Sequence, residues 1–146
     1  MKITLRNFQI FIFLLSVLLI SACGPTGPEI VVDDAWVRPD PLWENAAGYF
    51  NVTNTGGESD TLLGISIAIS DTERMHQTVM DGEIHKMLPV ENLEIAPGET
   101  IAFMPLSYHV MMIDLAAGLE YGQSISIAFE FEKSGAIEIQ AEIRAE

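Results

Sequence analysis

Residues 124–143 read Ser-Ile-Ser-Ile-Ala-Phe-Glu-Phe-Glu-Lys-Ser-Gly-Ala-Ile-Glu-Ile-Gln-Ala-Glu-Ile. Apolar residues occupy every second position from Ile125 to Phe131, and again from Ile137 to Ile143. A period of two is typical of a β-strand with one buried face, and the Ser134-Gly135 break is typical of a hairpin turn. This stretch therefore predicts two adjacent antiparallel strands.

The same kind of pattern continues toward the N-terminus, and no segment beyond residue 29 shows a persuasive helical period. Turn signals such as Asp81-Gly82, Pro97-Gly98 and Ala117-Gly118 separate the candidate strands. About nine short strands at this spacing predict an all-β fold, an antiparallel two-sheet β-sandwich or a Greek-key barrel. The seven further candidate strands are 30–37, 48–54, 62–69, 74–80, 83–88, 100–104 and 108–115.

The N-terminus carries a targeting pattern. Lys2 and Arg6 precede an apolar run over residues 8–20, which ends in Ile20-Ser21-Ala22-Cys23. A positive end, a short apolar stretch and small residues before a cleavage point are typical of a secretory signal, and this ending resembles the bacterial lipobox. We therefore expect a lipoprotein signal peptide at 1–22, lipidated Cys23 and a short tether at 23–29, and one folded domain at 30–146. This organisation predicts an extracytoplasmic protein, on the periplasmic or cell-envelope face, that is lipid-anchored to a membrane.

Composition narrows the classes of partner and chemistry. The net charge of −14 argues against nucleic acid, which requires clustered Lys and Arg. Cys23 is the only cysteine, and its use for lipid would leave the domain without a thiol or a disulfide. No Ser-His-Asp order, nucleophilic thiol or glycine-rich phosphate loop is evident, so we expect no enzyme and no catalytic residues.

Methionine and histidine are concentrated in one part of the chain. Apart from Met1, every methionine and every histidine lies between positions 75 and 112. Core packing does not require this, because methionine fills gaps throughout a core. Thioethers together with imidazoles favour copper(I), whereas Ca²⁺ and Mg²⁺ require oxygen ligands.

Strand geometry suggests how some of these residues meet. If Asp81-Gly82 forms a two-residue hairpin loop, His76 lies opposite Met87 and Thr78 lies opposite His85. His109 and Met111 are two residues apart on one strand and so share a face. Bringing the two pairs together would give a site with two nitrogens and two sulfurs, a step that periodicity does not show.

The spacing of these residues resembles a known signature. His76, ten residues, Met87, twenty-one residues, His109, one residue and Met111 reproduce the pattern of the periplasmic copper chaperone family PCu(A)C. The resemblance covers roughly residues 30 to 132, and its flanking blocks are 35–38, 47–54, 97–99 and 108–112.

This resemblance implies a cupredoxin-like or immunoglobulin-like β-sandwich that holds one Cu(I) through His76, Met87, His109 and Met111. It also implies a carrier role outside the cytoplasm, with copper passed to an accepting protein such as a cytochrome c oxidase subunit or another copper chaperone. In many members delivery is toward the dinuclear copper site of cytochrome c oxidase, which would make this chain an assembly factor for that site.

Alternative interpretations stay open at this point. His85 lies on the same face as His76 in the expected hairpin and is either an alternate ligand or an exposed strand residue. Met75 and Met112 should face away from their ligand neighbours and join the core. The same metal site would serve copper sequestration and tolerance, and a metal-free immunoglobulin-like surface lipoprotein is the alternative of a different class. A blue-copper electron carrier would need a Cys thiolate, and zinc seldom takes thioethers.

Overall fold

The computed structural model describes residues 26–115 and 119–145. The predicted signal peptide, Cys23 and the turn predicted at Ala117-Gly118 lie outside the described residues. Ten strands and no helix occur in the part of the chain that is described: β1 (Ile30–Pro39), β2 (Ala46–Asn54), β3 (Asp60–Ser66), β4 (Ser70–Asp81), β5 (Ile84–Pro89), β6 (Leu93–Ile95), β7 (Thr100–Phe103), β8 (Tyr108–Leu115), β9 (Ser124–Phe131) and β10 (Gly135–Ile143). Within these ranges, no helical segment could serve as a membrane span.

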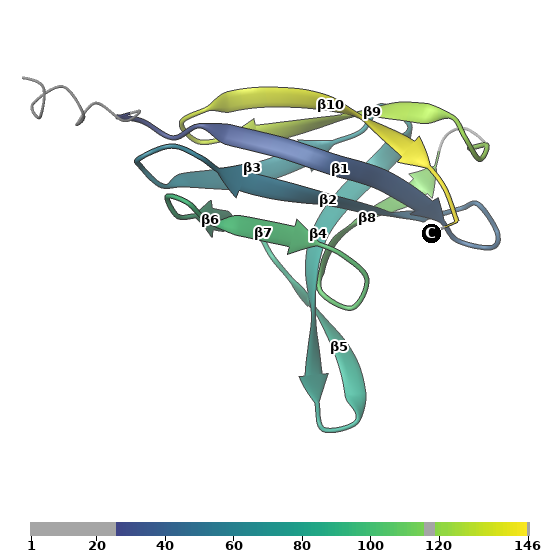
Figure 1. Ribbon diagram of the computed structural model, residues 1–146. Helices are drawn as coiled ribbons and strands as arrows, with labels where there is room; N and C mark the ends of the chain where they lie inside the picture. Colours follow the sequence, from purple (N-terminus) through teal and green to yellow (C-terminus); the bar gives the residue numbers. More distant parts are fainter. Residues whose placement is uncertain (1–25, 116–118, 146) are drawn as a thin grey trace, which may run out of the picture.

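The strands are hydrogen-bonded in the order β5-β4-β8-β7-β2-β1-β10-β9-β3-β6 (Figure 1). Many neighbours in this order are distant in sequence, as Greek-key connections require. The sheet folds over, so that Phe50 of β2 meets Phe129 of β9 across the core with ring centroids 4.7 Å apart. The predicted all-β sandwich class is thus confirmed. It is not wholly antiparallel, because β1–β10 and β7–β8 pair in parallel.

Nine of the ten strands correspond to predicted ones. The exception is β6, whose three residues are too few to display an alternating pattern. The hairpin of β9 and β10 was predicted from its alternation, and Phe131 pairs with Gly135 across a loop of three residues. Gly135 has a φ of 72°, a conformation that favours glycine.

The core follows from strand alternation. Phe50 stacks on Phe103 of the neighbouring strand β7 at 4.3 Å between ring centroids. Met75 and Met112 are buried among these apolar side chains, which confirms that they face away from the ligand candidates beside them. One face of β4 and β8 is therefore fixed against the core, and the adjacent residues must point to the other face.

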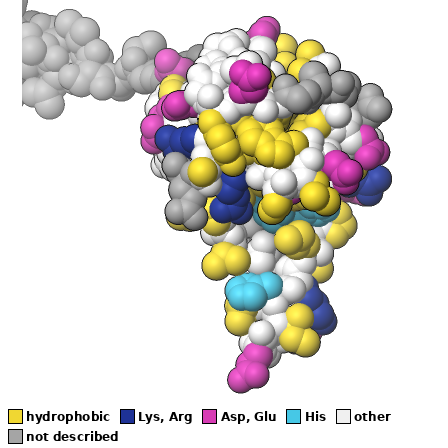
Figure 2. All heavy atoms as spheres, turned by 90° about the vertical axis from the view of Figure 1, so that its right-hand side faces the viewer, with side chains coloured by type: hydrophobic (Ala, Val, Ile, Leu, Met, Phe, Trp, Pro, Cys, Tyr) yellow, Lys and Arg dark blue, Asp and Glu magenta, His cyan; other side chains and the backbone are white. Residues whose placement is uncertain are grey.

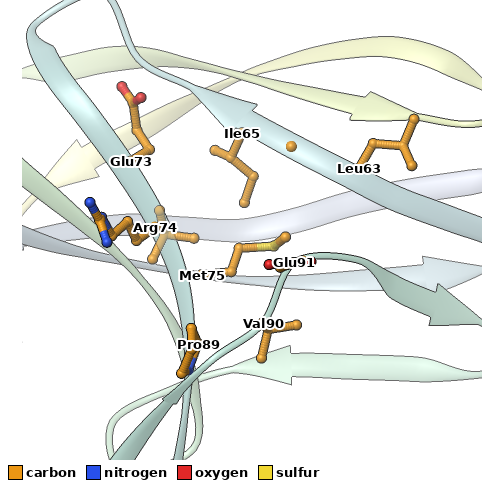
Figure 3. Close-up of a pocket in the computed structure, with 10 residues that line it drawn as sticks. Leu63, Ile65, Glu73, Arg74, Met75, Pro89, Val90 and Glu91 are labelled. Atoms are coloured by element: carbon orange, nitrogen blue, oxygen red, sulfur yellow. The ribbon is translucent and has the colours of Figure 1, made fainter.

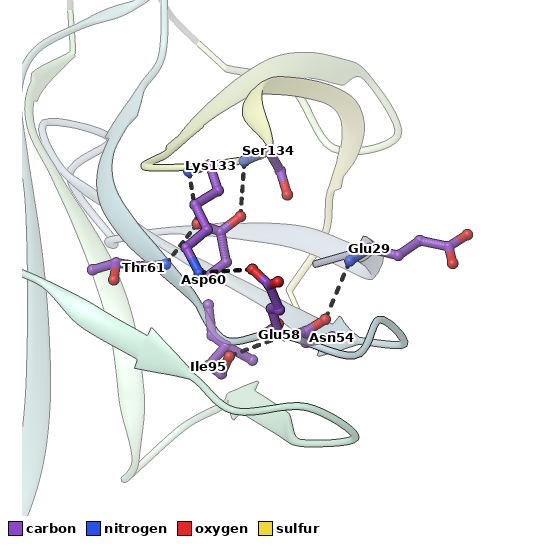
Figure 4. Close-up of polar contacts among 8 residues, drawn as sticks. All are labelled: Glu29, Asn54, Glu58, Asp60, Thr61, Ile95, Lys133 and Ser134. Atoms are coloured by element: carbon purple, nitrogen blue, oxygen red, sulfur yellow. Dashed lines mark hydrogen bonds and ion pairs between the residues drawn. The ribbon is translucent and has the colours of Figure 1, made fainter. Parts of the chain in front are cut away.

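Two buried polar side chains tie loops to this core (Figure 4). Asp60 accepts hydrogen bonds from the backbone N–H groups of Thr61 (2.8 Å), Lys133 (2.9 Å) and Ser134 (2.9 Å). Burial on its own would raise the pKa of Asp60, but the hydrogen bonds from these three backbone N–H groups outweigh burial and lower the pKa.

Asn54 plays the same part at the end of β2. Its amide nitrogen donates to the carbonyl oxygens of Glu58 and Ile95, and its amide oxygen accepts from the N–H groups of Gly56 and Glu29. Because all its hydrogen-bonding groups are used, a fully buried amide is tolerated here.

The hairpin of β4 and β5 extends away from the body of the molecule (Figure 1). All six residues of β5 are exposed, so this strand contributes nothing to the buried core. The base of β4 pairs with β8 within the main sheet, whereas its outer half pairs with β5. His76 and His109 lie at the junction of these two parts, Met87 lies beyond it, and Met111 lies within the main sheet.

Candidate metal centre

The centre is built around β4, which lies between β5 and β8 in the sheet. His76 of β4 pairs directly with His109 of β8, and their ring centroids are 5.7 Å apart. Directly opposed residues in an antiparallel pair point to the same face. Two imidazoles from distant parts of the sequence therefore lie side by side on the face of the sheet opposite Met75 and Met112.

The hydrogen bonding of His109 determines which of its nitrogens is available. Its Nδ1 lies 3.2 Å from the carbonyl oxygen of Ser107, so Nδ1–H is the donor and Nε2 keeps its lone pair. His109 is only 5 % exposed, and its Nε2 is buried without a hydrogen-bond partner. A histidine held through one nitrogen by a backbone carbonyl, with the other nitrogen vacant, is the usual arrangement of a metal ligand.

His76 presents a second vacant nitrogen. Its Nδ1 is also buried without a partner, and only one other side-chain atom among the described residues, Ser134 Oγ, shares that condition. Buried polar atoms normally find partners, so two vacancies on paired imidazoles need an explanation. A metal ion between the rings would satisfy both nitrogens.

The electrostatic setting keeps His76 neutral. Burial lowers the pKa of His76 below its usual 6.5, and the nearby His109 and Arg74 lower it further. A neutral imidazole is the form that binds a metal ion, since protonation occupies the lone pair.

Met111 shares the face of His109, two residues along β8, and is half-buried. It pairs with Arg74 of β4, which places a guanidinium group next to the proposed thioether ligand. Sequence reasoning did not identify Arg74 or the Ser107 carbonyl, because neither residue type marks a copper site. Only the pairing of β4 with β8 reveals them.

The register of the β4–β5 hairpin differs from the predicted one. The loop residues are Gly82 and Glu83, so that Asp81 pairs with Ile84 and Thr78 pairs with Met87. Gly82 takes a φ of 66° at the first loop position, where a type II′ turn places glycine. The prediction that His76 lies opposite Met87 was therefore wrong, and His76 faces Pro89 on this side.

The displacement is by two residues, so it leaves the predicted face unchanged. Met87 still shares a face with His76, but as a diagonal neighbour. Diagonal neighbours remain within reach of long side chains. Met87 is 62 % exposed, so it differs from the other three candidates in being free to move.

The remaining candidates occupy other positions. His85 pairs with Met80 on the outer part of the hairpin, and both are exposed. Two carboxylates of β4 have partners away from the histidines: Glu73 accepts a hydrogen bond from the N–H of Ile67, and Asp81 forms an ion pair with Lys86.

A hollow of about 390 Å³ lies on the other side of β4 (Figure 3). Met75 reaches into it between Ile65 and Val90, and none of the four ligand candidates lines it. Among the described residues, no three side chains of His, Cys, Asp or Glu come together as a metal site. The side chains with metal-binding atoms that lie beside the paired histidines are the thioethers of Met111 and Met87.

Comparison with known proteins identifies the family. A family model described as "Putative lipoprotein LpqE-like" matches residues 30–143. "Putative lipoprotein Lxx21020" of Leifsonia xyli subsp. xyli is 28 % identical over 109 residues, 74 % of this chain and 65 % of the relative. "Uncharacterized protein RP573" of Rickettsia prowazekii is 31 % identical over 102 residues, 66 % of this chain and 56 % of the relative. The chain thus spans less than two thirds of the length of these relatives.

Solved structures of PCuAC domains share the fold. The apo domain from PmoF1 superimposes with a TM-score of 0.68 at 24 % identity, over 83 % of this chain and 97 % of that one. The copper-bound domain from PmoF2 gives 0.66 at 21 % identity, over 83 % and 100 %. Cu(I)-bound DR1885 of Deinococcus radiodurans gives 0.57 at 20 % identity, over 86 % and 82 %. The chain belongs to the LpqE-like family, and its fold is that of the PCu(A)C domains.

Proposed function

We propose that this protein binds one Cu(I) ion through His76, His109, Met111 and Met87 and passes it to a copper-accepting protein outside the cytoplasm. One observation carries the proposal: the directly paired rings of His76 and His109, with a vacant buried nitrogen on each. Met111 supplies the adjacent thioether, and Met87 completes the set from the hairpin.

The choice of Cu(I) rests on the chemistry of these donors. Imidazole and thioether are neutral, and soft thioethers select Cu(I) over zinc and over hard cations. Thioethers also do not form disulfides, which suits an oxidising compartment. Copper-bound relatives of the same fold, the PmoF2 domain and Cu(I)-DR1885, support this choice.

The difference in exposure among the ligands suits a carrier. The vacant nitrogen of His109 is buried and fixed, so it would hold the ion in place. Met87 is exposed on the projecting hairpin, so an approaching partner could displace it first. Exchange of one ligand at a time would let the ion leave without a large rearrangement of the protein.

The cellular setting belongs to the proposal. The family's description and that of the Leifsonia relative as lipoproteins support an anchor at Cys23 and a place on the extracytoplasmic face of a membrane. The acceptor would be another copper protein, with assembly of the cytochrome c oxidase copper site as the specific task. Copper sequestration would use the same ligands and differs only in whether the ion is handed on.

The test is an anaerobic Cu(I) titration of the full-length protein in detergent against a competing chromophoric chelator. We expect one tightly bound equivalent, with affinity reduced at least tenfold in His109→Ala and in Met111→Leu, because each removes a direct ligand. Met104→Leu is the matched control, since Met104 is an exposed methionine on the loop after β7. If Met104→Leu reduced the Cu(I) affinity as much as Met111→Leu, the ligand assignment would be contradicted.

Absence of Cu(I) binding above that of the denatured protein would contradict the carrier function itself. The metal-free surface lipoprotein would then be the better account. Transfer of bound copper to an acceptor would separate delivery from sequestration.

A further inference from the structure

We propose that the outer half of the β4–β5 hairpin carries a second, weaker Cu(I) site formed by Met80 and His85, with Met87 shared between it and the inner site. The geometry of the second site stands on its own residues. Its role as the point where copper enters and leaves rests on the proposed function.

Met80 and His85 are direct partners across the hairpin. Directly opposed residues have Cβ atoms about 4.5–5.5 Å apart, which lets a thioether and an imidazole reach the same ion. Met80 is 60 % exposed and His85 is exposed as well, so neither is committed to packing. A large exposed thioether beside an exposed imidazole is better explained by binding than by stability.

The donors occupy one face of the hairpin only. Met80, Thr78 and His76 alternate along β4, and Met87 and His85 occupy the matching positions of β5. The opposite face carries an ordinary ion pair between Asp81 and Lys86. Figure 2 shows histidine side chains at two levels, at the base of the projection and partway along it, with apolar side chains near both.

Met87 lies between the two levels. It pairs with Thr78, and Thr78 is followed two residues along by Met80 on one side and preceded by His76 on the other. Met87 is therefore a diagonal neighbour of both sites, within reach of a long flexible side chain. All the donors are neutral, so an ion could move from one site to the other by exchanging ligands with no change of charge or oxidation state.

The two sites should differ in strength. At the inner site the donor nitrogens of His76 and His109 are already buried and vacant. At the outer site two exposed side chains must be immobilised before they can bind, which opposes association. We therefore expect the inner site to fill first.

The first measurement uses Ag(I), a soft and redox-inert probe, with the full-length protein in detergent and with its methionine methyl groups and histidine rings labelled with ¹³C. We expect the first equivalent to shift the Met111 and Met87 signals, and the second to shift those of Met80 and the His85 ring. Unchanged Met80 and His85 signals at excess Ag(I) would overturn the second site and leave the inner one intact.

The second measurement is the rate at which the Cu(I)-loaded protein transfers its ion to a competing chelator. Met80→Leu and His85→Ala should slow transfer at least threefold, with the equilibrium affinity of the first equivalent unchanged. The matched control exchanges neighbours, His85→Lys with Lys86→His, which keeps the composition but moves the imidazole to the opposite face. This double variant should lose the second site as completely as His85→Ala.

The outcomes separate the two proposals. Ag(I) shifts confined to Met80 and His85 would overturn the inner site while supporting the outer one. Normal binding of the second equivalent by the double variant would contradict the outer site, because the imidazole of that variant lies on the opposite face of the hairpin from Met80.

Discussion

His109 shows how a single backbone carbonyl selects the nitrogen that a histidine offers. The Ser107 carbonyl oxygen accepts a hydrogen bond from Nδ1–H, so the proton stays on Nδ1 and the buried Nε2 has a lone pair without a donor. His76 is held neutral by burial and by its two cationic or titratable neighbours, which lower its pKa. Both vacant nitrogens are thus available to a cation in the apo protein. Arg74, which pairs with Met111, places a positive charge beside this site.

Arg74 should weaken retention of Cu(I). Its guanidinium adds positive charge beside Met111 and His76, and at an exposed position such repulsion is below about 1 kcal/mol. We expect Arg74→Gln to raise Cu(I) affinity about two- to threefold in the chelator competition, and to raise the pKa of His76 in the apo protein by NMR titration. Arg144→Gln removes an equal charge over the Trp36 ring and should leave both quantities unchanged.

Equal effects of Arg74→Gln and Arg144→Gln would show that overall charge, and not local repulsion, controls affinity.

The sequence alone could name the four ligand candidates, because soft donors at a family spacing are visible in it. It could not show the direct His76–His109 pair, since strand alternation says nothing about which distant strands become neighbours.

At the scale of the element, the hairpin of β4 and β5 illustrates how turn chemistry sets register. Asp81-Gly82 signals a turn, but the loop residues are Gly82 and Glu83, because glycine is placed where the backbone needs positive φ. Alternation fixed the face of each residue correctly, and the error of two residues changed only the partners. That is why Met87 remains a candidate ligand despite the wrong register.

Gly82→Ala tests the importance of this turn. A Cβ at Gly82 would meet no atom within 4 Å, so its only penalty is the backbone conformation, at a φ of 66°. We expect a loss of about 1 kcal/mol in the stability of the hairpin, measured by amide hydrogen exchange of β5. Gly64→Ala is the control, because Gly64 also has open space but no positive φ.

Slower amide hydrogen exchange of β5 in the Gly82→Ala variant than in the wild type would contradict the proposed turn. If Met87 is a ligand, the same variant should also weaken Cu(I) binding modestly, since a loosened hairpin must be ordered again on binding. Gly64→Ala should not.

At the scale of the whole molecule, one core supports a rigid base from which the hairpin projects. The alternation of 124–143 and of the other strands was sufficient to predict an all-β sandwich. It did not predict that β1 and β10 run in parallel, because a pattern of period two has no direction. Nor did it predict the buried Asp60 and Asn54, whose roles depend on loops that only the fold brings within hydrogen-bonding distance.

Asp60 makes the stability of this base depend on pH. Its pKa is lowered below 3.8 in the folded protein, so the carboxylate stabilises the fold above that value. This contribution is lost as the pH falls through the lower, folded pKa, because protonation removes the negative charge that strengthens the hydrogen bonds from the Lys133 and Ser134 N–H groups. Asp60→Asn should therefore reduce the free energy of unfolding by about 1–3 kcal/mol at pH 7, where the charged hydrogen bonds are intact.

The difference in the free energy of unfolding between the wild type and Asp60→Asn should narrow in urea unfolding at pH 3. That pH is below the ordinary value of 3.8, so the Asp60 carboxyl of the unfolded chain binds a proton there, whereas the amide does not titrate. Glu91→Gln, at an exposed carboxyl, should cost nothing measurable at either pH. If the difference in the free energy of unfolding between the wild type and Asp60→Asn stays constant with pH, the shape of the side chain matters and its charge does not. In either case the hairpin, which lies far outside the core, should keep its Cu(I) affinity as long as the base remains folded.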